Sequence, residues 1–155
     1  MIATLPLKSV SGIFFRAVDP LHAAEALSGS RGDGRYSRAG QPTLYLSASL
    51  EGVEAALIAH RASDERERVV LRFAVEAARI ADLRDGDTLA RVREKAGDPF
   101  TDWRETAAPP SWSVRDWIEA QGADGLIDPS RKAPGLWHLV LFRWNVPGGP
   151  IVRAQ

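Results

Sequence analysis

The sequence predicts an α+β domain with a central mixed or antiparallel β-sheet and flanking helices. Runs rich in β-branched and aromatic residues are interspersed with runs of helical periodicity along the chain. The last two β-type runs are joined by a segment too short for a crossover helix, so they should pair antiparallel. A length of 155 residues corresponds to one domain, residues 1–155, large enough to bury a hydrophobic core.

The first third of the chain contains two predicted strands and two predicted helices. Residues 12–18, GIFFRAV, are hydrophobic and β-rich, which favours a first strand. Helical spacing follows over residues 21–29, where a Ser-Gly pair ends it. Residues 43–47 favour a second strand. Ser49 is a suitable N-cap for a helix over residues 50–61.

The middle of the chain predicts two more strands, one helix and one irregular segment. Residues 68–75, RVVLRFAV, alternate well enough for a strong strand, and residues 78–83 form a separate short one. Residues 88–96 have helical spacing. Residues 96–112 contain three prolines, which favours an irregular connection that covers a pocket.

The last third predicts one helix and two strands. The helix spans residues 113–121, with Ser113 as its N-cap and a glycine after its end. A short strand at residues 126–127 and a long one within residues 136–144, LWHLVLFRW, complete the chain.

Composition excludes several classes of function. Twenty basic residues balance twenty acidic ones, so no global charge attracts nucleic acid or an anionic membrane. The absence of cysteine excludes disulfides, thiolate metal sites and a cysteine nucleophile, and neither His22 nor His138 has the spacing of a metal site. The N-terminus lacks a signal-peptide pattern, and no apolar run is long enough to span a bilayer. We therefore expect a soluble, cytoplasmic protein without a metal.

Residues 30–42, SRGDGRYSRAGQP, combine Arg31, Arg35 and Arg38 with closely spaced glycines. Glycine lets backbone N–H groups approach a ligand closely, and the guanidinium fork matches phosphate oxygens. The loop therefore either binds a diphosphate or is a solvated surface loop whose glycines form turns. It is neither a Walker A loop nor a GxGxxG dinucleotide motif.

Four further side chains are candidates for a binding site. Alternation along the second strand places Tyr45 and Ser47 on one face, where Tyr45 is either a core residue or a platform for a flat heterocycle. Arg16 lies within an apolar strand, so its charge either reaches water at a sheet edge or points into a polar site. Ser130 follows Asp-Pro and either caps a turn or hydrogen-bonds a ribose or phosphate.

Taken together, these motifs resemble the RES domain, the toxin half of bacterial RES–Xre toxin–antitoxin modules, which is similar to ADP-ribosyltransferases of the diphtheria-toxin type. Five elements match the family's pattern in order: FFRA with Arg16, DGRY with Arg35 and Tyr36, GQPTLYLS with Tyr45, ALIAH with His60, and ADGLIDPSRK with Ser130. The matches run through most of the chain. Their order and spacing are more specific than any one of them.

One position departs from the family. The catalytic glutamate of the family lies on the helix after the tyrosine strand. It is eleven residues past the position of Tyr45 and four before that of His60, where this chain has Ala56. Glu54 is the nearest carboxylate, but two residues along a helix turn a side chain by about 200°. Either Glu54 substitutes through a shifted register, or the chain lacks this carboxylate.

The resemblance implies that NAD is the substrate and that ADP-ribose is transferred to a bacterial protein. Arg31 or Arg35 then binds the diphosphate, Tyr45 stacks on the nicotinamide, and the glutamate position, Ala56, faces the ribose. The NAD-binding residues that it implies are Arg16, Arg31, Arg35, Tyr36, Tyr45, Ser47 and Ser130.

Two other functions fit the same sequence. One is a toxin on the same fold that degrades NAD with water or phosphate as the acceptor. The other is a non-catalytic ligand-binding module, for which the missing glutamate is the best argument. The resemblance also implies an Xre-like helix-turn-helix antitoxin as partner, and no direct contact with nucleic acid or membrane.

Overall fold

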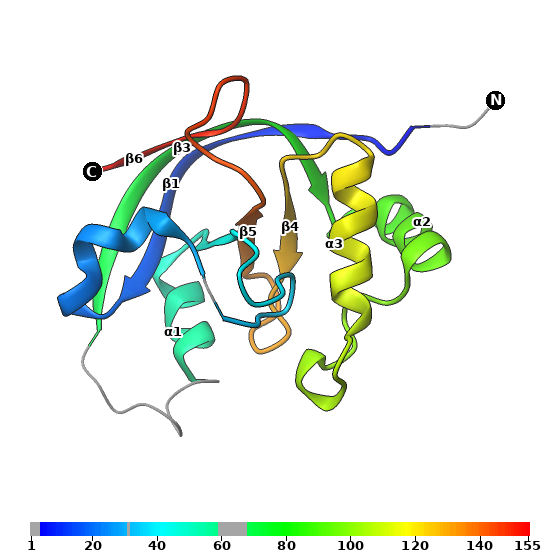
Figure 1. The fold of residues 1–155 in the computed structure, drawn as a ribbon, viewed down its shortest axis with the longest axis horizontal. Helices are drawn as coiled ribbons and strands as arrows, with labels where there is room; N and C mark the ends of the chain where they lie inside the picture. Colours follow the sequence, from blue (N-terminus) through cyan, green and yellow to red (C-terminus); the bar gives the residue numbers. More distant parts are fainter. Residues whose placement is uncertain (1–3, 31, 59–67) are drawn as a thin grey trace.

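The structure, a computed structural model, describes residues 4–30, 32–58 and 68–155, with the backbone alone for residues 56–58. Strands and helices alternate irregularly, which confirms the α+β prediction (Figure 1). In chain order the elements are β1 (Lys8–Val18), the 3-10 helix η1 (Pro20–Ser28), β2 (Leu44–Ser47), α1 (Leu50–Ile58), β3 (Val69–Asp82), α2 (Gly86–Ala96), the 3-10 turn η2 (Trp103–Glu105), α3 (Pro110–Ala120), β4 (Gly125–Pro129), β5 (Trp137–Leu141) and β6 (Ile151–Ala154).

The described strands form one mixed sheet in the order β1-β2-β5-β4-β3-β6. β1 also pairs with β3 along most of its length, so the sheet folds back on itself. β3 and β4 run parallel, and the other pairs run antiparallel. The predicted antiparallel pairing of the two strands after α3 is confirmed, because β4 and β5 pair in that direction.

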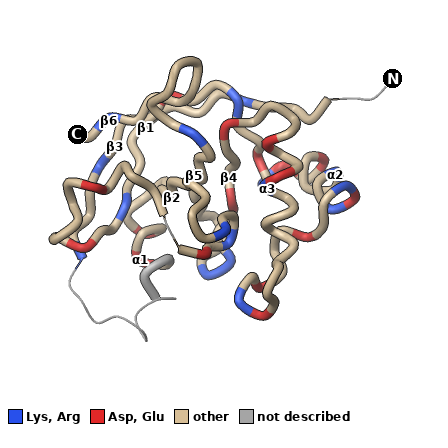
Figure 2. Tube along the Cα trace, in the orientation of Figure 1, with Lys and Arg blue, Asp and Glu red and all other residues tan. Residues whose placement is uncertain are grey.

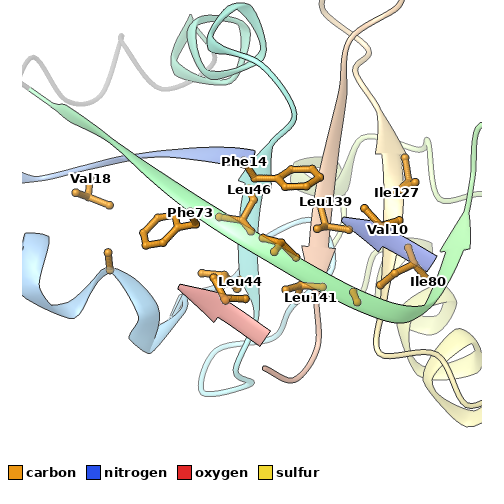
Figure 3. Packing of buried hydrophobic residues seen from close by; sticks show 14 residues of the cluster. Val10, Phe14, Val18, Leu44, Leu46, Phe73, Ile80, Ile127, Leu139 and Leu141 are labelled. Carbon is orange, nitrogen blue, oxygen red and sulfur yellow. The ribbon is translucent and has the colours of Figure 1, made fainter. Parts of the chain in front are cut away.

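Two hydrophobic clusters lie on opposite faces of β4 and β5. The first packs between the β1–β3 pair and β2, β5 and β4, where Phe14 and Leu46 lie near Leu139 (Figure 3). The second packs against α2 and α3 and takes Leu126 and Val140 from the sheet. Successive residues of a strand point to opposite faces. The polar residues two positions along the strands from Leu126 and Val140 therefore lie on the α3 side.

Several predicted boundaries are wrong. Residues 68–83 do not form two strands but the single strand β3, because β1 pairs with it without a break from Val69 to Ala77 and again at Ile80. The helix expected at residues 113–121 begins at Pro110, so Ser113 is not its N-cap. Proline suits a first helical turn, since its ring fixes a helical φ and its missing N–H is not needed there.

Two other elements differ from expectation. The segment before the arginine–glycine loop is the 3-10 helix η1, with a non-helical residue, His22, inside it. β6 was not predicted; its four residues pair with the middle of β3. No helix in the described ranges is long and apolar enough to cross a membrane.

Asp82, at the end of β3, should make stability depend on acid. Burial alone would raise its pKa, but hydrogen bonds from Arg84 and Lys8 outweigh this and lower it to about 2, from an ordinary 3.8. Its charge therefore stabilises the fold above pH 3.8, and this contribution is lost as the pH falls toward 2.

We expect Asp82→Asn to lower the free energy of unfolding by about 1–2 kcal/mol at pH 7 and by much less near pH 2.5. Urea unfolding of both proteins at the two pH values measures the difference. An equal loss at both values would contradict this reading of the ion pairs.

Candidate functional site

Three polar side chains lie side by side on the α3 face of the sheet. The register pairs His138 of β5 with Ser47 of β2 on one side and with Asp128 of β4 on the other. Ser47 Oγ lies 3.0 Å from His138 Nδ1. Tyr45 pairs with Val140 two residues along and belongs to the same face. The predicted common face of Tyr45 and Ser47 is therefore the face on which this polar row lies.

A partly buried ion pair closes one end of the row. Asp128 is only 6 % exposed and accepts hydrogen bonds from Arg131 at 3.2 Å and from the Tyr36 hydroxyl at 2.8 Å. Burial, and next the Asp128 charge, raise the pKa of Tyr36 well above its ordinary value. Tyr36 is fully buried, so this sequence-predicted residue underlies the row rather than lining an open surface.

Arg35 is the loop arginine that lies beside this ion pair. Burial, and next the charge of Arg131, lower its pKa, while Asp128 favours its charge. One terminal nitrogen, Nη1, is buried and has no hydrogen-bond partner among the described residues. A buried unpaired donor costs free energy, and an anionic oxygen would satisfy it. Basic residues also gather in the turn after β4, at the lower centre of Figure 2.

Arg16 of β1 contacts the main chain of Tyr45. It donates to the Tyr45 carbonyl at 3.1 Å, and its Nε is buried without a partner in the described part of the chain. Burial lowers the pKa of Arg16. The Tyr45 hydroxyl accepts from the Tyr36 N–H at 3.0 Å and bonds Ser37 Oγ at 2.8 Å. Tyr45 therefore anchors the loop by its hydroxyl, and the residue as a whole is half-buried.

Helix α3 holds the arginine–glycine loop by its main-chain carbonyls. Trp112 Nε1 donates to the Gly34 carbonyl at 2.8 Å, and the Ser111 hydroxyl donates to the Arg35 carbonyl. Arg115, which is 2 % exposed, donates to the Tyr36 carbonyl at 3.0 Å. The same guanidinium donates to Pro42 O and Thr43 Oγ1. The loop conformation is thus set by the helix, which leaves the Arg35 side chain available.

The other loop arginines have different positions. Arg38 forms a two-bond ion pair with Asp116 of α3 on the surface, away from the row. Arg31, with its expected diphosphate role, and His60, with its place in the motif, lie outside the described residues.

Helix α1 packs its first turn against the row. Ser49 caps the helix, as predicted, because its hydroxyl accepts from the Gly52 N–H at 3.1 Å. A methyl group on Gly52 would lie 3.4 Å from Ser47 Cβ and 3.7 Å from His138 Cε1. At about 100° per residue, position 56 follows Gly52 on the same side of the helix. Glu54 is exposed, which agrees with its expected place on the other side.

Ser130 lies in the turn between β4 and β5. Its hydroxyl accepts from the Ala133 N–H at 3.2 Å, and its own N–H donates to the Leu136 carbonyl at 2.8 Å. Ser130 thus closes the turn that carries Arg131. Contact of Ser130 with a ribose or phosphate stays a prediction.

Sequence reasoning missed three members of the site: Asp128, Arg131 and His138. The signal was the β4–β5 hairpin, since its register alone brings Asp128 opposite His138. No group of three His, Asp or Glu side chains that could hold a metal ion occurs among the described residues.

Comparison with known proteins identifies the family. Residues 13–155 match the family model described as the RES domain. The fold is similar to a chain in the crystal structure of the M. tuberculosis MbcT–MbcA toxin–antitoxin complex, with a TM-score of 0.64, 19% sequence identity, and coverage of 95% of this chain and 84% of that one. No curated protein matches. Because the family match spans most of the sequence, the chain belongs to the RES domain family.

Proposed function

We propose that this chain is the toxin of a toxin–antitoxin pair and uses NAD to ADP-ribosylate a bacterial protein. Membership of the RES family supports an NAD site. The observation that carries the proposal is the buried, unpaired Nη1 of Arg35 beside the Tyr45–Ser47 face. An anion with a flat aromatic group attached, as in NAD, matches a guanidinium next to a tyrosine.

In this mechanism the bond between ribose C1′ and nicotinamide breaks with its electron pair leaving on nicotinamide. The transition state carries positive charge on the ribose, so the protein must hold the dinucleotide and stabilise that charge. Arg35 binds the diphosphate, Tyr45 stacks on nicotinamide, and Ser47 and Ser130 position the ribose. Arg16, held on the Tyr45 carbonyl, adds a second cation for phosphate. Tyr36 keeps the Asp128–Arg131 pair in place.

The similar chain was solved in a toxin–antitoxin complex, which supports an antitoxin partner for this chain. We propose that this partner is an Xre-like helix-turn-helix protein that covers the NAD site in the bacterial cytoplasm. The acceptor is then a cytoplasmic bacterial protein.

Arg35→Ala tests the NAD site. A charge-assisted hydrogen bond to phosphate is worth about 1.5–3 kcal/mol, so NAD affinity should fall about 10- to 100-fold. Calorimetric titration of NAD measures this. The matched control is Arg38→Ala, which removes a neighbouring arginine of the same loop from an exposed ion pair and should change the affinity less than about 3-fold.

Equal effects of the two substitutions would contradict the assignment of Arg35. If the unmodified chain and the Ala56→Glu protein both bind NAD but neither turns it over, the non-catalytic module takes the place of this proposal. Ala56 is the observation that favours that second candidate.

A further inference from the structure

His138 lies where the family's missing carboxylate would act. It pairs with Ser47 across the β2–β5 ladder, and its Cε1, the ring carbon between the two nitrogens, faces Gly52 of α1. Position 56 is one helical turn beyond Gly52, on the same side of α1. An imidazole and the position of the absent carboxylate therefore adjoin one another at the ribose end of the proposed site.

One nitrogen of this imidazole is fixed and the other is available. Nδ1 is 3.0 Å from Ser47 Oγ. The hydrogen bonds of the described residues include none to Nε2. When Nδ1–H donates to Ser47, the lone pair of Nε2 is free to accept a proton. In that tautomer the Ser47 hydroxyl accepts from Nδ1–H and holds the orientation of the ring.

We propose that His138 serves as the general base of this chain in place of the carboxylate that Ala56 lacks. The inference rests on the proposed NAD function. The C1′–nicotinamide bond breaks, and its electron pair leaves on the nicotinamide nitrogen. An oxygen of the acceptor, water in the absence of a protein, bonds to C1′. Its proton passes to Nε2 of His138 and later to solvent.

The surroundings of His138 favour its neutral form. Burial lowers its pKa, the Asp128 charge opposes this, and Arg131 and Arg35 lower it further. Asp128 faces it from β4, Arg131 from the β4–β5 turn, and Arg35 from the loop, whereas β2 contributes Ser47 and α1 contributes Gly52. The charged residues Glu51 and Glu54 of α1 are exposed. A neutral histidine keeps a free lone pair at pH 7 and places no positive charge next to the ribose until it accepts the proton.

The test is a cycle of His138→Asn and Ala56→Glu, with nicotinamide release from NAD as the readout. Asparagine keeps a polar partner for Ser47 but has no basic nitrogen. In the unmodified background His138→Asn should lower turnover about 100-fold, the range of a lost general base, with NAD affinity changed less than about 3-fold. In the Ala56→Glu background it should lower turnover less than about 5-fold, because the carboxylate takes over. His22→Asn, a change of an exposed histidine on η1, is the matched control and should have no effect.

The pH profile adds a readout that a purely structural role would not move. Turnover of the unmodified chain should fall on the acid side with a midpoint below the ordinary histidine pKa, and this limb should vanish in the His138→Asn protein. Equal effects of His138→Asn in both backgrounds, or no effect in either, would overturn the inference. The proposed function would still stand if these proteins bind NAD. Binding of NAD without turnover by the unmodified chain would also overturn it. Loss of NAD binding in every protein would overturn both.

Discussion

Ala56→Glu is expected to raise the rate of nicotinamide release from NAD by about 10²-fold, the lower end of the range for one electrostatic group at a developing charge. Position 56 follows Gly52 on the side of α1 that packs against Ser47 and His138. A carboxylate there would stabilise positive charge on the ribose and accept the proton of the acceptor. Because substrate binding depends on other residues, the change should appear in kcat and leave KM within about 3-fold.

The control for this substitution is Glu54→Gln. Glu54 is exposed, about 200° around the helix from position 56, so its loss should leave turnover unchanged. A fall in the turnover of the unmodified chain would show instead that Glu54 supplies the carboxylate through a shifted register. No gain from Ala56→Glu, in a protein that binds NAD normally, would contradict the placement of α1 beside the ribose.

Arg115→Leu is expected to lower the free energy of unfolding by about 3 kcal/mol. Arg115 is 2 % exposed and donates to three oxygens of the loop at residues 36–43, at distances from 2.5 to 3.1 Å. Leucine fills much of the space and keeps an apolar contact with Phe142, but it leaves those oxygens unpaired in the interior. Urea unfolding, with the midpoint and slope fitted together, measures the loss.

Arg93→Leu is the matched surface change. Arg93 forms an ion pair with Asp98 in which both side chains are about half exposed, so the expected loss is less than about 1 kcal/mol. Arg115→Leu should also weaken NAD binding, because the carbonyls that it frees position Arg35. An Arg115→Leu protein as stable as the Arg93→Leu protein would contradict the role of α3 as the support of the loop.

The sequence indicated the fold class and part of the site for definable reasons. β2, β5 and residues 12–18 of β1 are hydrophobic runs next to turn residues, so they are recognisable locally. β3 was divided into two strands because Glu76 and the two alanines after it interrupt the β-type run, and only its pairing with β1 shows that it is continuous. Ser113 has the residue type of an N-cap, but the prolines before it already satisfy the start of α3.

For the site, alternation was sufficient to place Tyr45 and Ser47 on one face. Asp128, Arg131 and His138 required the register between two strands, which is a tertiary property. The different positions of Arg35 and Arg38 depend on α3, whose bonded residues lie 76 positions beyond Arg35 and 78 positions beyond Arg38. No local pattern distinguishes the two arginines.

The most direct test of the central claim is incubation of the Ala56→Glu protein with NAD and bacterial lysate. Nicotinamide is quantified, and the intact masses of the lysate proteins are measured. We expect nicotinamide release together with the mass of ADP-ribose on a lysate protein. Release without any labelled protein would replace the transferase by an NAD-degrading enzyme. An absence of both release and NAD binding would contradict the proposal that this chain acts on NAD.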